Sequence, residues 1–423
     1  MSVPTGQAVV VTGLGCVSPI GNDVPTFWDA VLSGATGASA ITSFDTSPYR
    51  THVGCEVKVL DELRASRAAR LRDKKGPQGR GNGRRSEGLG RATELAILAA
   101  VEALEQAGID PESEGRQLGV SLGTTMGESN FLDQLTAANE AGSDESRWTQ
   151  VLTRSAWSIT AGVASQLGIR GIQASLPAAC SAGNYAVGLA FDLIRQGKLE
   201  AALAGGAEAF SESAFAGFHR LNAMSPDVCR PFDRDRRGLL LGEGAGVLVL
   251  EAEDRALRRG VPILAKVLGY GLSCDAHHIT GPHPEGEGAA AAMRHALADA
   301  GASADDVGWV CCHGTGTLQN DRIEARAIHH VFGARARNLP VSSIKALTGH
   351  MMGAASAVEA IACVHALHHS VLPPTWNQVH LDPECDLDVI PNAPREARTR
   401  IVLNNSYAFG GNNACVAFTG GAG

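Results

Sequence analysis

The sequence predicts a protein of the α/β class that carries an internal duplication. Apolar runs of strand length alternate with stretches of helical periodicity from one end of the chain to the other. The chain has 423 residues, which is too long for one simple core and suits two fused halves or one large layered unit. Its 50 glycines indicate many tight turns between strands and helices.

The individual elements follow from periodicity and turn residues. A helix is predicted from Thr93 to Gln106, because four apolar residues recur at helical spacing and Gly108 ends the pattern. The segment Ser181–Gln196 is apolar almost to its end, as expected of a helix that is buried on all sides. Buried strands are predicted over Ala8–Thr12, Leu118–Leu122, Ala201–Ala204, Ala245–Leu250 and Arg400–Leu403.

The second half of the chain repeats the order of the first. A helix ending at Gly108 leads to a strand ending at Thr125, and a helix ending at Gly301 leads to a strand that runs into Thr317. The strand near Val10 has its counterpart in the segment 265–269. We therefore predict two related halves, residues 1–258 and 259–423, with chance similarity of two α/β segments as the alternative. In the duplicated arrangement, residues from opposite halves meet at a pseudo-two-fold interface.

Composition excludes several classes of function. The net charge of −8 argues against nucleic acid as the main partner, and no apolar stretch approaches the length of a membrane span. The N-terminus does not resemble a signal peptide, and the ten cysteines form no CxxC pair, so we expect reduced thiols in a cytoplasmic protein. One segment, Arg64–Arg85, holds nine basic residues and only one acidic residue. It indicates either a solvated loop or a docking patch for an acidic protein.

Cys180 is the candidate nucleophile. It lies in the small-residue turn Ser175–Asn184, which leads directly into the predicted apolar helix. Helix N–H groups would point at this cysteine, and their dipoles favour the thiolate, which is the reactive form. An inert core thiol is the alternative, but none of the other nine cysteines follows such a turn.

Two histidines are the candidate partners of this cysteine. His313 and His350 each end a strand-like segment and are flanked by glycines, which allow a ligand to approach the backbone. Together with Cys180 they predict acyl transfer through a thioester. His277 and His278 are the closest rivals. A metal site is disfavoured, because His313 and His350 lack the i, i+4 spacing and no carboxylate accompanies them.

A third glycine-rich turn follows the predicted strand near the C-terminus. Gly410 and Gly411 come directly after Phe409, and their small size would expose backbone N–H groups. The pattern indicates either a simple hairpin turn or one half of an oxyanion hole.

These residues together resemble the elongating β-ketoacyl-acyl carrier protein synthases of the thiolase-fold superfamily. The resemblance spans essentially the whole chain. It implies a thiolase-like, five-layered αβαβα fold, a dimer and an acyl pocket that reaches the dimer interface. The matching motifs are Val9–Gly15, the turn Ser175–Asn184, Arg230–Gly246, His313–Thr317, Lys345–His350 and Phe409–Gly411.

The resemblance implies a decarboxylative Claisen condensation that gives β-ketoacyl-acyl carrier protein. Cys180 would take an acyl chain from the phosphopantetheine thioester of an acyl carrier protein. His313 and His350 would stabilise the enolate formed when malonyl-acyl carrier protein loses carbon dioxide. The backbone N–H groups of Cys180 and Phe409 would form the oxyanion hole. No cofactor of the enzyme itself is implied, because the carrier protein brings the phosphopantetheine, and no metal is implied.

The resemblance also gives supporting roles to residues around these groups. Lys345 would order the site and pair with Glu359, and Phe409 would act as a gate. The expected substrate-binding residues are Thr315 and Thr317, which would contact the pantetheine, and Met126, which would limit the depth of the acyl chain.

Three departures from the usual fatty acid synthase pattern bear on the pathway. The sequence has Asn320 before Asp321, the pair Asn412 and Asn413 after the C-terminal glycines, and Glu128 near the expected acyl pocket. The first two resemble ketosynthases of type II polyketide systems that build reduced or polyene chains. Such a protein would be a homodimer, or the catalytic partner of a chain-length-factor-like subunit.

Alternative functions are less consistent with the motifs. They are a housekeeping synthase of fatty acid elongation, a non-condensing acyltransferase on the same fold and a non-catalytic chain-length-factor-like scaffold. Both histidines and Lys345 favour condensation, and the intact cysteine argues against the scaffold. A thiolase would be expected to use a second cysteine, for which Cys415 is the candidate, but the Lys345–His350 pattern fits the synthase better.

Overall fold

The structure is a computed structural model, and it describes residues 6–58, 89–140 and 154–421. The basic segment Arg64–Arg85 lies outside the described residues. Eleven strands form one mixed sheet in the order β12-β10-β9-β14-β15-β8-β1-β7-β6-β4-β5. Their bounds are β1 Val9–Val17, β4 Leu118–Gly123, β5 Gln173–Leu176, β6 Ala201–Glu208, β7 Gly244–Ala252, β8 Ala265–Cys274, β9 Val307–Cys311, β10 Pro340–Ser342, β12 Asp388–Val389, β14 Ile401–Tyr407 and β15 Asn412–Gly420.

The strand order contains the duplication that the sequence predicts. Outward from the centre, the first half runs β1-β7-β6-β4-β5, and the second half runs β8-β15-β14-β9-β10. In both halves the first two pairings are antiparallel and the next two are parallel. β1 pairs with β8 where the halves meet, Val9 opposite Val267. The two halves meet between β7 and β8 in the sequence, where helix α9 (Glu253–Arg259) lies. The boundary between residues 258 and 259 stays a prediction.

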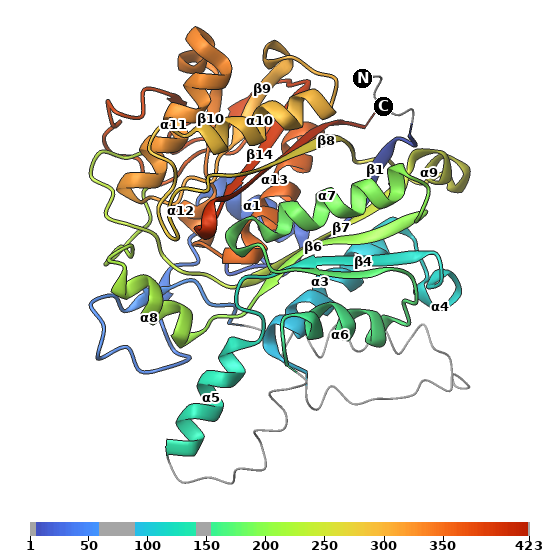
Figure 1. Cartoon of the computed structure of the whole chain (residues 1–423), viewed down its shortest axis with the longest axis horizontal. Helices are drawn as coiled ribbons and strands as arrows, with labels where there is room; N and C mark the ends of the chain where they lie inside the picture. The colour runs from blue at the N-terminus through green and yellow to red at the C-terminus, as the bar shows by residue number, and fades with distance from the viewer. Residues whose placement is uncertain (1–5, 59–88, 141–153, 422–423) are drawn as a thin grey trace.

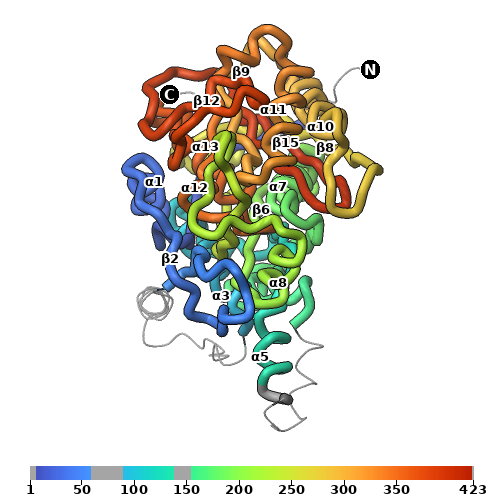
Figure 2. The backbone as a smooth tube through the Cα atoms, turned by 90° about the vertical axis from the view of Figure 1, so that its left-hand side faces the viewer, coloured from blue at the N-terminus to red at the C-terminus, as the bar shows by residue number. Residues whose placement is uncertain are grey.

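Helices complete five layers, as Figure 1 and Figure 2 show. The middle layer consists of two helices, α7 (Ala182–Arg195) and α13 (Ala355–His369), which contact strands of both halves. One outer face is covered by α3 (Arg91–Ala107) and α6 (Trp157–Leu167). The other is covered by α10 (Glu287–Asp299) and α11 (Leu318–Phe332). One large apolar cluster surrounds the two middle helices and one lies beneath each outer pair of helices, so the thiolase-like αβαβα prediction is confirmed.

The remaining elements are short or peripheral. Helix α5 extends from the body of the molecule (Figure 1, Figure 2). In the part of the chain that the structure describes, no helix is long and apolar enough to cross a membrane. The other helices are α1 Val24–Ser33, α4 Pro111–Glu114, α5 Ser129–Glu140, α8 Glu212–Arg220 and α12 Lys345–Thr348, and the short strands are β2 Ser39–Ala40, β3 Val53–Gly54, β11 Val371–Leu372 and β13 Arg395–Glu396.

Candidate active site

Cys180 lies in a tight turn at the head of the central helix α7. The turn is a single 3₁₀ element, Ala179–Ser181, and the cysteine is 5% exposed. Ala179 has φ 49°, in the left-handed region that non-glycine residues rarely adopt, so the backbone is strained one residue before the thiol. Two residues further on, the single hydroxyl proton of Ser181 lies between two acceptors in the second half, the backbone carbonyls of Ser406 (2.9 Å) and Asn412 (2.8 Å).

A buried amide pair ties the nucleophile helix to the second half. The Nδ2 of Asn184 donates to the carbonyl of Asn404 (2.9 Å), and the Nδ2 of Asn404 donates back to Oδ1 of Asn184 (3.0 Å). The backbone N–H of Asn184 also donates to the hydroxyl of Ser356 on α13 (3.0 Å). The head of α7 is therefore fixed at the interface between the halves, where the sequence predicts the site.

His313 and His350 face one another in the second half. Their ring centroids are 5.2 Å apart with planes at 81°. The backbone N–H of His313 donates to Glu324 (2.8 Å), and that of His350 donates to the carbonyl of Leu240 (2.7 Å). The Nδ1 atom of each ring is buried and has no hydrogen-bond partner.

Lys345 connects these groups electrostatically. It is 1% exposed and forms a buried ion pair with Glu359 on α13. Its charge lowers the pKa of Cys180, of His313 and of His350. Lys345 therefore acts on the cysteine and on both histidines, and it is paired with Glu359, the glutamate that the family resemblance assigned to it.

The ionisation of the site differs from the sequence-based expectation in one respect. Burial raises the pKa of Cys180 to about 12, and the positive charge of Lys345 only partly opposes this. Burial therefore opposes the thiolate that the helix dipoles favour, because desolvation outweighs the favourable charges around the thiol. Burial also holds the pKa of His313 and His350 well below the usual range, so both imidazoles are neutral at physiological pH.

Phe409 lies at the outer edge of the site. It is 37% exposed and stacks on Phe218, with ring centroids 5.5 Å apart, while Phe218 in turn meets the ring of His350 at 6.5 Å. The glycines after it are not the free donors that the sequence suggested. The N–H of Gly410 donates to the carbonyl of Ile279 (2.8 Å), and the N–H of Gly411 donates to that of Ala408 (3.1 Å). Both glycines therefore shape the turn instead of serving a ligand.

The predicted substrate-binding residues lie in loops that follow parallel strands. Thr315 and Thr317 follow β9, and their hydroxyl oxygens are 2.9 Å apart. Thr317 also caps the start of α11. Met126 follows β4, is 36% exposed in the single chain, and donates its N–H to Glu208 (2.9 Å).

The departures at positions 320 and 128 have structural explanations. Asn320 donates its Nδ2 to Asp321 (3.0 Å), which is wholly buried and also accepts the N–H groups of Phe232 (2.8 Å) and Gly316 (3.2 Å). Glu128 is buried and accepts the N–H groups of Ala92 (3.1 Å) and Thr93 (2.7 Å), so it caps helix α3. The rival histidines at positions 277 and 278 are exposed on the surface.

Sequence reasoning missed two carboxyl groups at the site, Glu208 and Glu324. Both are wholly buried, and burial raises the pKa of each to about 7. Glu324 accepts the N–H groups of His313 (2.8 Å) and Gly314 (2.7 Å). For Glu208 the sequence offers one signal: it is a charged residue at the end of the apolar run Ala201–Glu208.

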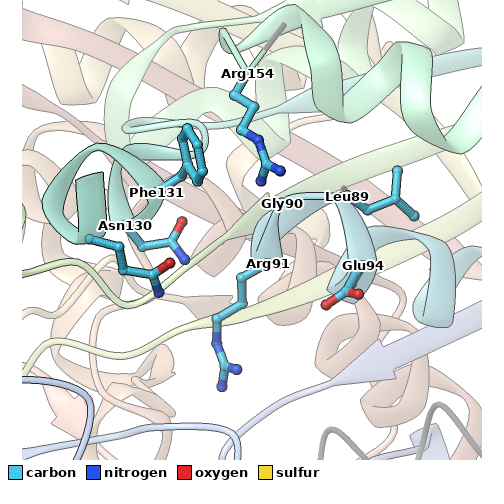
Figure 3. Close-up of a pocket in the computed structure, with 8 residues that line it drawn as sticks. Leu89, Gly90, Arg91, Glu94, Asn130, Phe131 and Arg154 are labelled. Atoms are coloured by element: carbon cyan, nitrogen blue, oxygen red, sulfur yellow. The ribbon is translucent and has the colours of Figure 1, made fainter. Parts of the chain in front are cut away.

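A cavity of about 210 Å³ opens between α3 and α5, as Figure 3 shows. None of the predicted site residues lines it, so it is separate from the groups around Cys180. The side chain of Arg154 lies over the ring of Phe131 there, 3.9 Å from its centroid. Its lining residues are Leu89, Gly90, Arg91, Glu94, Asn130, Phe131, Gln134 and Arg154.

A buried cysteine at a helix head, two neutral histidines and a buried lysine on a duplicated five-layer fold define a condensing enzyme of the thiolase type. The chain belongs to the β-ketoacyl synthase family: the model of the β-ketoacyl synthase N-terminal domain matches residues 6–256, and that of the C-terminal domain matches residues 264–379. It is a β-ketoacyl-acyl carrier protein synthase, which condenses an acyl chain with a malonyl unit on acyl carrier protein.

Similar proteins cover the whole chain. Nodulation protein E of Rhizobium sp. (strain N33) is 38% identical over 97% of this chain and 99% of its own. The 3-oxoacyl-[acyl-carrier-protein] synthase 2 of Staphylococcus aureus (strain COL) is 37% identical over 97% of this chain and 98% of its own. A chain of the solved structure titled "The ishigamide ketosynthase/chain length factor" is 40% identical, covers 99% of this chain and 100% of its own, and has a TM-score of 0.87.

Proposed function

We propose that Cys180 carries the acyl chain and that His313 and His350 drive the condensation. The observation that supports this most directly is the buried cluster itself. A cysteine at a helix head lies within the electrostatic reach of Lys345, and the same lysine acts on two neutral imidazoles in ring contact. A thiol and neutral hydrogen-bond donors, without a metal, are the groups that thioester exchange and enolate stabilisation require.

In the first step the sulfur of Cys180 attacks the carbonyl carbon of the acyl thioester on the carrier protein. The new carbon–sulfur bond forms as the bond to the phosphopantetheine sulfur breaks. Because burial raises the pKa of the Cys180 thiol to about 12, the proton leaves during the attack and not before it. A neutral imidazole accepts this proton and returns it to the departing phosphopantetheine thiol.

In the second step malonyl-acyl carrier protein binds at the position that the first carrier protein has left. His313 and His350 donate hydrogen bonds to its thioester oxygen, and the enolate left by departing carbon dioxide is stabilised there. The enolate carbon attacks the acyl carbonyl on Cys180, and the carbon–sulfur bond to the enzyme breaks. The backbone N–H groups of Cys180 and Phe409 serve as the oxyanion hole for this attack, and the released thiolate takes up a proton.

The supporting residues keep these groups in place. Lys345 and Glu359 hold the charge balance of the buried site. Phe409, partly exposed and stacked on Phe218, is the gate through which the thioester enters. Thr315 and Thr317 contact the pantetheine arm, and Met126 sets the depth of the acyl pocket.

For the pathway we propose type II polyketide synthesis of a reduced or polyene chain, as an antibiotic-type product. This is supported by the 40% identity to a chain of a ketosynthase/chain length factor structure and by the asparagines at positions 320, 412 and 413. The partners are an acyl carrier protein and a second subunit of the same fold, and the protein acts in the cytoplasm without a cofactor of its own. Fatty acid elongation is the second candidate, because the Staphylococcus aureus synthase is 37% identical.

Intact-protein mass spectrometry tests the proposal. The protein, alone and with its partner subunit, is incubated with a panel of acyl carrier protein thioesters and then with malonyl-acyl carrier protein. The expected result is an acyl adduct on the peptide of Cys180, followed by a β-ketoacyl product that is two carbons longer. Cys180→Ala should abolish both. Cys274→Ser is the matched control, because Cys274 is the exposed thiol among the ten cysteines, all of which the structure describes. An adduct lost in Cys274→Ser but kept in Cys180→Ala would refute the assignment.

A further inference from the structure

Glu208 is a buried group that the proposed mechanism leaves unused. It is the last residue of β6 and is wholly buried. Its Oε1 accepts hydrogen bonds from the N–H of Met126 (2.9 Å) and the hydroxyl of Thr124 (3.1 Å). Its Oε2 accepts from the N–H groups of Thr125 (2.7 Å) and Gly353 (3.0 Å). One carboxylate therefore holds two segments from opposite halves of the chain.

Both segments lie directly beside the nucleophile turn. A Cβ on Gly353 would lie 2.5 Å from the Cα of Thr124, so the two backbones are in contact. A Cβ on Gly123 would lie 2.2 Å from the carbonyl carbon of Ala182, the first residue of α7. Only glycine permits such close approach. Met352, before Gly353, is held at φ 44°, which indicates a turn fixed by its surroundings.

We infer that Glu208 is a positioning residue that fixes the acyl-pocket loop 124–127 against the turn 352–354, which follows His350. The carboxylate thereby sets two quantities together: the depth of the acyl pocket at Met126 and the placement of the histidine segment relative to Cys180. The inference rests on the proposed roles of Met126 and His350, and it extends them by naming the group that couples chain-length selection to the catalytic geometry.

The charge of Glu208 is part of this arrangement. Three backbone N–H groups and one hydroxyl donate to the carboxylate, and the N–H groups cannot accept a hydrogen bond from a protonated oxygen, so this arrangement favours the charged form. Burial raises the pKa of Glu208 to about 7, and the four donors oppose this shift. Its negative charge also raises the pKa of Cys180, as that of Glu359 does, whereas the charge of Lys345 lowers it.

Glu208→Gln tests the inference in the full-length enzyme with its partner subunit. The amide cannot accept from all four donors, because its NH₂ group must face two of them. Two readouts are measured: the rate at which Cys180 is acylated by saturated acyl-carrier-protein thioesters of increasing length, and the pH midpoint of its alkylation by iodoacetamide. Discrimination between chain lengths should fall about tenfold or more, because small displacements of reacting groups cost up to about 10² in rate. The alkylation midpoint should move to lower pH.

Glu56→Gln is the matched control. Glu56 is a buried carboxylate that accepts the backbone N–H groups of Thr42 (2.9 Å) and Ser43 (3.0 Å), but it is not one of the groups around Cys180, where the main charge effects come from Lys345, Glu208 and Glu359. It should lose thermal stability while keeping the wild-type chain-length discrimination and alkylation midpoint. If Glu208→Gln matches this control in both readouts, its role is merely structural and the inference is wrong.

A second variant keeps the test decisive if Glu208→Gln does not fold. Thr124→Val removes the hydroxyl that donates to Glu208 but preserves the charge. It should weaken chain-length discrimination and leave the alkylation midpoint unchanged, and unaltered discrimination would overturn the inference. A wild-type enzyme that is not acylated at Cys180 would instead refute the proposed function. The inference about Glu208 could still be tested in that case, because alkylation by iodoacetamide needs no acyl donor.

Discussion

The buried ion pair between Lys345 and Glu359 gives the sharpest quantitative prediction. Both side chains are 1% exposed, and Oε2 of Glu359 has no hydrogen-bond partner, so little else compensates this carboxylate. Lys345→Met leaves the carboxylate buried without its cation, which costs about 3–5 kcal/mol of unfolding free energy. The double variant Lys345→Met/Glu359→Leu should recover most of this loss, because an apolar pair of similar volume is often as stable as a buried ion pair.

The loss in Lys345→Met should also depend on pH. Burial already raises the pKa of Glu359 to about 7, and removal of the lysine raises it further. A carboxyl group whose folded pKa is raised loses stability as the pH increases from its unfolded value to its folded value. The wild type completes this loss near pH 7, whereas the variant continues to lose stability above it. The destabilisation should therefore grow between pH 7 and pH 9.

Urea denaturation at a fixed protein concentration measures these differences. Alkylation of Cys180 gives an independent readout, because Lys345 lowers the pKa of that thiol and its removal should shift the alkylation midpoint to higher pH. The reasoning would be refuted if the losses of unfolding free energy in the single variants Lys345→Met and Glu359→Leu simply added in the double variant. A loss below about 1 kcal/mol in Lys345→Met would refute it equally, because that is the value of an exposed ion pair.

Three further predictions follow from contacts at the site. Replacing His350 by alanine should lower malonyl decarboxylation by about 10²–10³, as loss of a preorganised donor does; stopped assays of carbon dioxide release at pH 8 check this. Gly353→Ala should destabilise the protein by about 1–3 kcal/mol, because its Cβ would meet backbone 2.5 Å away, and an unchanged melting temperature would contradict this. Asn184→Ala removes one of the two acceptors of the buried Asn404 amide and the donor to the Asn404 carbonyl, and it should cost about 1–3 kcal/mol in urea denaturation, whereas the exposed Asn338→Ala should cost nothing measurable.

Much of the fold could be predicted because its signals are local. Helix α3 was expected from Thr93 to Gln106 and runs from Arg91 to Ala107, since the apolar period and Gly108 depend only on neighbouring residues. The strand expected at Ala201–Ala204 continues to Glu208. The residues beyond Ala204 are two glycines and an alanine, which are small enough to be buried in the strand but do not extend the apolar pattern. The repeated order of helix and strand also predicted the duplication that the sheet displays.

Candidate members of the site could be named from local sequence signals, but the electrostatics of the site could not. Cys180, His313 and His350 stand out because each is on a glycine-rich or small-residue turn that a strand or helix dictates. The resting state of the thiol could not be predicted in this way. The helix dipole favours ionisation, but desolvation by segments distant in sequence wins and raises the pKa to about 12.

By itself, the sequence determined the α/β class, the repeat, and the turns that present a cysteine and two histidines, because periodicity and turn chemistry act within a few residues. Only the tertiary structure decided that Glu208 and Glu324 belong to the site, that Glu128 caps a helix, and that the N–H groups of Gly410 and Gly411 are already used. These properties depend on which distant segments exclude water and supply hydrogen-bond partners, and that is settled only when the two halves pack against α7 and α13.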